Sequence, residues 1–81
     1  MRKLKVRHER LPGIGDRFEL DTTAGLTVSV VTHRSGRRDI SISEPGAETP
    51  LVTARLSRAE AVAVVGLLTG LHIELTAMTR V

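Results

Sequence analysis

Short runs in which apolar and polar residues alternate are the feature of this sequence that most constrains its fold. Alternation with a period of two is typical of strands that have one face on a core and the other in water. The runs occupy residues 3–6, 17–21, 26–33, 38–43, 51–56 and 71–78. They predict one small, mostly antiparallel sheet of about five to six strands, because turn residues separate most of the runs.

The apolar positions within the runs predict which face of the sheet meets the core. Phe18, the only aromatic residue of the chain, falls on this face. The other members are aliphatic: Leu4, Val6, Leu20, Leu26, Val28, Val30, Ile40, Ile42, Val52, Ala54, Leu56, Leu71, Ile73, Leu75 and Ala77. The residues between them are mostly charged or hydroxylated, which predicts a solvated opposite face.

Glycine and proline mark the connections between the runs. In the segment 11–15, Pro12 fixes one φ angle and two glycines permit positive φ, so we expect a structured turn rather than a phosphate-binding loop. Ser35 and Gly36 separate two alternating runs and predict a tight hairpin. The segment 44–50 contains two prolines and a glycine, which predict an exposed loop.

A helix is predicted directly after the run 51–56. Ser57 and Glu60 have the spacing of a capping box, in which each side chain bonds the backbone amide of the other residue. The helix is expected over residues 58–69, with Gly70 as its left-handed C-terminal residue. The fold class expected from these elements is α+β, with this strongly apolar helix as the principal one.

The composition of this helix predicts an interaction surface. Its apolar residues surround most of the circumference, and one small sheet cannot cover two sides of a helix. We therefore expect a homo-oligomer, with a dimer as the simplest form. The partner interface is expected at Val62, Val65, Gly66, Leu68 and Leu71, where Gly66 permits close backbone approach.

The whole chain, residues 1–81, is expected to form a single domain, because chains of this length rarely bury two cores. Hydrophobic residues make up 41% and charged residues 26%, which is typical of globular domains. Cysteine is absent, which excludes disulfides and thiolate metal sites. The N-terminus lacks the apolar segment of a secretory signal, and the uncharged stretch 61–73 is too short to span a bilayer. We expect a cytoplasmic protein with no membrane span of its own.

The sequence predicts no catalytic residue, cofactor or metal site. His8, His33 and His72 are far apart and never have the spacing by which one helix presents two imidazoles to zinc. His33 is nevertheless the histidine best placed to sense pH, since it ends a strand beside an arginine-rich hairpin. The alternative, that His33 is an ordinary residue at a strand end with no sensing role, is favoured.

Positive charge offers a second functional reading. The formal net charge is +3, and Arg34, Arg37 and Arg38 cluster at the predicted hairpin. These arginines predict a contact with an anion, or a small basic DNA-binding regulator that uses the hairpin 33–39. Specific nucleic-acid binding is disfavoured, because stacking of single-stranded bases needs aromatic residues and the only one is predicted to face the core.

Several segments together resemble a known family. Residues 11–15, 17–20 and 30–39, followed by an acidic loop with proline and the helix start at 56–61, are similar to bacterial KhtT-type regulatory subunits of potassium/proton antiporters. The resemblance extends over most of residues 11–70.

The resemblance implies a non-enzymatic, dimeric regulatory subunit that contacts a membrane cation/proton antiporter at the inner face of the membrane. In that family a TrkA C-terminal-type domain follows and carries the ligand site. Its absence from this chain predicts that no cofactor or ligand residue carries over. The same absence offers another reading of the apolar helix, whose spare face would pack on that second domain.

Overall fold

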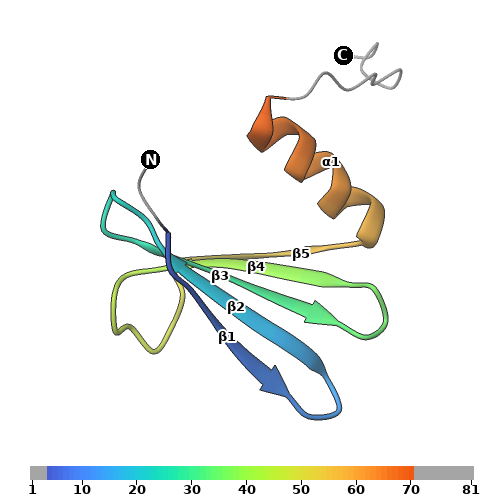
Figure 1. Cartoon of the computed structure of the whole chain (residues 1–81), viewed down its shortest axis with the longest axis horizontal. Helices are drawn as coiled ribbons and strands as arrows, with labels where there is room; N and C mark the ends of the chain where they lie inside the picture. Colours follow the sequence, from blue (N-terminus) through green and yellow to red (C-terminus); the bar gives the residue numbers. More distant parts are fainter. Residues whose placement is uncertain (1–3, 71–81) are drawn as a thin grey trace.

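The computed structural model describes residues 4–70, which form a five-stranded antiparallel sheet followed by one helix. The strands are β1 (Val6–Leu11), β2 (Gly15–Asp21), β3 (Thr27–His33), β4 (Arg38–Ser43) and β5 (Val52–Leu56). Each strand pairs with its neighbours in sequence, so the order across the sheet is β1-β2-β3-β4-β5. Figure 1 shows this twisted meander with the helix above one of its faces.

The register of the strands gathers the apolar residues on one face, as the alternation predicted. Phe18 lies opposite Val30, Val30 opposite Ile40, and Ile40 opposite Ala54. The next row joins Val6, Leu20, Val28, Ile42 and Val52 in the same way. We call this the apolar sheet face.

The opposite face carries charged and hydroxylated side chains paired across the strands. Arg7 of β1 bonds Asp21 of β2 at 2.8 Å and approaches Glu19 at 3.4 Å. Ser41 and Thr53 exchange a hydrogen bond of 3.1 Å between β4 and β5. Such cross-strand pairs suit a solvated face, which we call the polar sheet face.

Gly15 is required by the close approach of two strands. A Cβ at this position would overlap the backbone carbonyl oxygen of Thr32, in the neighbouring strand β3. Its φ of 154° is also one that other residues rarely adopt. The turn before it is closed by a hydrogen bond of 2.9 Å from the Ile14 amide to the Leu11 carbonyl, which confirms the predicted turn at 11–15.

The helix α1 (Arg58–Thr69) begins and ends where the sequence predicted. The Ser57 hydroxyl accepts from the Glu60 amide at 3.1 Å, and the Glu60 carboxylate accepts from the Ser57 amide at 2.8 Å. Gly70 closes the other end in the left-handed conformation, with φ of 81°. The capping box therefore fixes the start of α1 at a single residue after β5.

The expected fold class, α+β with a principal and strongly apolar helix, is wrong. The described chain is mostly antiparallel sheet, and α1 is one short helix of twelve residues, with Gly66 as its only buried residue. Only Ser57 separates the edge strand β5 from α1. The helix therefore leaves the sheet at its edge and stands above the apolar sheet face without packing closely against it, as Figure 1 shows.

Two expected strands differ from the structure or lie outside it. The first strand was expected at 3–6 but begins at Val6 and continues to Leu11, because it pairs along its whole length with β2. The strand expected at 71–78 lies outside the described residues. The sheet described in residues 4–70 therefore has five strands.

Candidate functional site

The first candidate surface is a cavity between α1 and the apolar sheet face. It has a volume of about 330 Å³ and an almost entirely apolar lining. Val30 and Ile40 contribute from the sheet, and Val64, Val65 and Leu68 contribute from the helix. Within residues 4–70, no large apolar side chain is fully buried. The two apolar surfaces thus face each other without closing into a packed core.

The residues expected at a partner interface lie on α1 with different degrees of exposure. Val62, Val65 and Leu68 expose 67%, 57% and 75% of their surface. Gly66 is buried, and Leu71 lies outside the described residues. Three of the five predicted residues are therefore accessible apolar side chains, and two of these three line the cavity.

The second candidate surface is a charged cluster on the polar sheet face. His33 Nε2 lies 3.0 Å from Asp39 Oδ2, and Arg37 Nη2 donates to the same oxygen at 3.2 Å. Arg37 Nη2 also lies 3.1 Å from His33 Nε2. Arg55 of β5 approaches the other Asp39 oxygen at 3.8 Å. Asp39 is therefore the centre on which two arginines and a histidine converge.

The electrostatics of this cluster favour an ionised Asp39. Partial burial raises the pKa of Asp39, but the hydrogen bond from His33 and the charge of Arg37 outweigh it, so that the pKa lies below its ordinary value of 3.8. The His33 and Asp39 side chains are only 18% and 20% exposed. Sequence reasoning placed His33 beside the arginine-rich hairpin but missed Arg55, which reaches the cluster through the pairing of β5 with β4.

Comparison with known families decides what kind of domain carries these surfaces. A family model described as "K(+)/H(+) antiporter subunit KhtT, N-terminal domain" matches residues 4–72. The chain belongs to this family. The matched residues include all five strands and α1, so the whole described fold corresponds to this N-terminal domain. No curated protein matched the chain.

This membership confirms the resemblance seen in the sequence. KhtT is a subunit of a K⁺/H⁺ antiporter, which is consistent with a regulatory role rather than with an enzyme. Within residues 4–70 no three metal-binding side chains come together. In the same residues no helix is long and apolar enough to cross a membrane.

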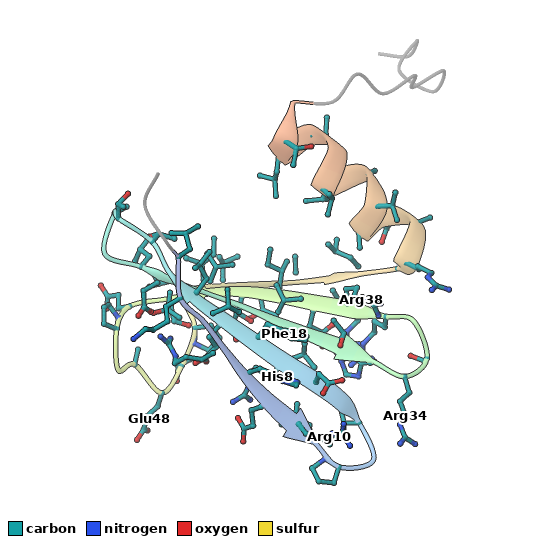
Figure 2. The ribbon with its side chains drawn as sticks, in the orientation of Figure 1. His8, Arg10, Phe18, Arg34, Arg38 and Glu48 are labelled. Carbon is teal, nitrogen blue, oxygen red and sulfur yellow. The ribbon has the colours of Figure 1, made fainter. Side chains whose placement is uncertain are left out.

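The hairpin arginines of this KhtT domain lie in three different settings. Arg34 projects from the β3–β4 turn, away from the helix (Figure 2). Arg37 is engaged with Asp39. Arg38 donates to the carbonyls of Gly36 and Arg37 at 3.1 and 3.2 Å, and its side chain lies on the side of the sheet that faces α1. The three arginines predicted to act together are therefore directed to different places.

A contact that sequence reasoning missed lies at the other end of the apolar sheet face. The rings of His8 and Phe18 stack with centroids 4.7 Å apart, and His8 Nε2 lies 2.9 Å from Asp16 Oδ1. Figure 2 shows the two rings on adjacent strands. Phe18 lies opposite Val30 on the apolar sheet face, where it was expected. It is only partly buried there, and the His8 ring occupies part of the same face.

Proposed function

We propose that this KhtT N-terminal domain is a non-enzymatic regulatory module that acts through protein contacts of its apolar surfaces. Its partners are a membrane K⁺/H⁺ antiporter and a second copy of the same chain. The proposal puts the domain in the cytoplasm, at the inner face of the membrane, where its partner holds it. The observation that carries it is the uncovered apolar sheet face together with the accessible Val65 and Leu68.

The free energy gained by burying apolar side chains favours a partner that covers this surface. Burying a valine or leucine side chain stabilises an assembly by about 1.5–3 kcal/mol. Val62, Val65, Leu67 and Leu68 all stay more than half exposed on a helix of twelve residues. Contiguous apolar surface of this kind is typical of sites that bind other proteins.

The family supports the choice of partner. A domain of a K⁺/H⁺ antiporter subunit acts where the transporter is, and it has no helix in residues 4–70 with which to enter the bilayer itself. A contact with the transporter protein supplies that connection. The polar sheet face, with its ion pairs, remains available to solvent.

Transport measurements test the proposal. Membrane vesicles that hold the K⁺/H⁺ antiporter of the same genome would be assayed for potassium-driven proton movement, with and without the subunit that carries this domain. We expect the subunit to change the exchange rate. A subunit with Leu68→Asp is expected to lose this effect, because a charge on the apolar surface opposes association. An exchange rate that stays the same with and without the wild-type subunit would contradict the proposal.

A further inference from the structure

A second pocket lies at the corner of the sheet where β5 gives way to α1. The β3–β4 turn meets the start of the helix there, and a Cβ on Gly36 would lie 4.0 Å from the Cβ of Arg58. The pocket has a volume of about 430 Å³. It is lined by three arginines, two serines, a glycine and a leucine: Arg37, Arg55, Arg58, Ser35, Ser57, Gly36 and Leu56.

The charges around this pocket do not balance. Asp39 pairs with both Arg37 and Arg55, at 3.2 and 3.8 Å. Arg58 makes no ion pair with any other residue in the range 4–70. The nearby Glu60 carboxylate is held by the Ser57 amide in the capping box. Even when the charges of both Asp39 and Glu60 are counted, the three guanidinium groups leave the surroundings of the pocket positive.

The hydrogen-bonding groups of the lining are donors. Guanidinium groups can only donate. The Ser57 oxygen already accepts from the Glu60 amide at 3.1 Å, and the Ser35 oxygen lies 3.5 Å from the Arg37 amide as an acceptor. Each hydroxyl therefore has its own hydrogen left to donate. A negative ligand that offers acceptors fits these donors.

We propose that this pocket binds a phosphate group. Planar guanidinium forks match the oxygen pairs of phosphate, and the arginines of the pocket come from the β3–β4 turn, β5 and α1. The pocket is open to solvent, with a volume of about 430 Å³. Two sources of the phosphate group fit such an open site, a dissolved phosphate ester and a lipid headgroup.

Titration of the full chain with inorganic pyrophosphate tests the site, with amide chemical shifts in NMR spectra as the readout. We expect shifts concentrated at Ser35, Gly36, Ser57 and Arg58. Arg58→Gln removes the arginine without an ion pair and is expected to weaken binding about tenfold, as the loss of a charge-assisted hydrogen bond does. The thermal unfolding midpoint of the wild type and of the variant would also be measured, to verify that the variant folds.

Arg34→Gln is the matched control. It removes the same charge from the same hairpin, but Arg34 does not line this pocket. We expect this variant to bind as tightly as the wild type. Equal weakening by Arg34→Gln and Arg58→Gln would overturn the proposal, because it would mean attraction to overall charge alone.

Flotation with vesicles distinguishes the two sources of phosphate. The chain would be mixed with phosphatidylcholine vesicles that do or do not contain phosphatidylglycerol. Binding of pyrophosphate without flotation supports a dissolved ester, and flotation that Arg58→Gln abolishes and Arg34→Gln preserves supports a headgroup. Absence of both would overturn the proposal. None of these measurements includes the antiporter, so their failure leaves the proposed regulatory function standing.

Discussion

The imidazole of His33 joins the carboxylate of Asp39 across the β3–β4 hairpin, with Nε2 and Oδ2 3.0 Å apart. The pKa of Asp39 lies below its ordinary value of 3.8, so the ionised form is favoured in the folded chain. Its contribution to stability is therefore present above about pH 4 and is lost as pH falls through the lowered pKa.

Replacement of Asp39 tests this contribution. We expect Asp39→Asn to lower the free energy of unfolding at neutral pH by about 1 kcal/mol or less, because the group is partly solvated. The variant should also lose part of the acid dependence below pH 4. Urea unfolding at several pH values measures both effects. Asp21→Asn, which removes a carboxylate paired with Arg7 in full solvent, is expected to cost less.

His33 supplies a prediction about pH sensing. Nε2 lies near both Arg37, which can donate to a neutral imidazole, and Asp39, which can accept from a protonated one. Arg55 approaches the same carboxylate from β5. Both contacts depend on the protonation state of the imidazole. We expect His33→Gln in the full subunit to flatten the pH dependence of antiporter exchange.

His8 provides the control for this measurement. It also lies beside a carboxylate, Asp16, at 2.9 Å, but on the other sheet face and on the edge strand β1. His8→Gln is expected to leave the pH profile unchanged. If His33→Gln leaves the profile unchanged as well, His33 is an ordinary residue at a strand end and senses no protons.

Charge substitutions on α1 test the proposed interface. Leu68 lines the cavity that faces the sheet, whereas Leu67 does not line it, although both side chains are more than 60% exposed. We expect Leu68→Asp to convert a dimer into a folded monomer, and Leu67→Asp to leave the dimer intact. Sedimentation velocity measures the masses and circular dichroism checks the fold. A wild-type chain that sediments as a monomer at high concentration would refute the predicted dimer.

Gly15 offers a prediction about the sheet itself. Gly15→Ala brings a methyl group onto the Thr32 carbonyl, so β2 and β3 must separate locally. We expect a loss of about 1–3 kcal/mol in the free energy of unfolding. Gly46→Ala is the comparison, because its φ is also positive, at 75°, but its added methyl meets no atom within 4 Å. Equal losses in the two variants would show that strand contact is not the cause.

Local signals were sufficient to predict most of the fold. The alternation of residues such as Val28, Val30, Ile40 and Ile42 predicted both their strands and their shared face, because the period of two is set by backbone geometry. The capping box at Ser57 located α1 in the same way. The end of β1 was missed because the run Arg7–Arg10 is polar throughout, and only its pairing with β2 makes it a strand.

The predicted site depended on relations that local patterns do not contain. The helix was expected to keep one apolar side for a partner, but its place above the sheet depends on the link through Ser57, from which it rises at the edge of β5. The pocket of Arg37, Arg55 and Arg58 was missed for a similar reason. These residues meet only because β4 pairs with β5, and their spacing along the chain does not predict that pairing.

The order of the strands also governs how the domain folds. Every pairing joins consecutive strands, so the sheet can grow one hairpin at a time without closing a long loop. Folding rates rise as the sequence separation of contacts falls. The sheet should therefore form faster than a Greek-key sheet of equal size. Because α1 makes its main contacts with the sheet along β5, the strands can stay paired when the helix reorients towards a partner.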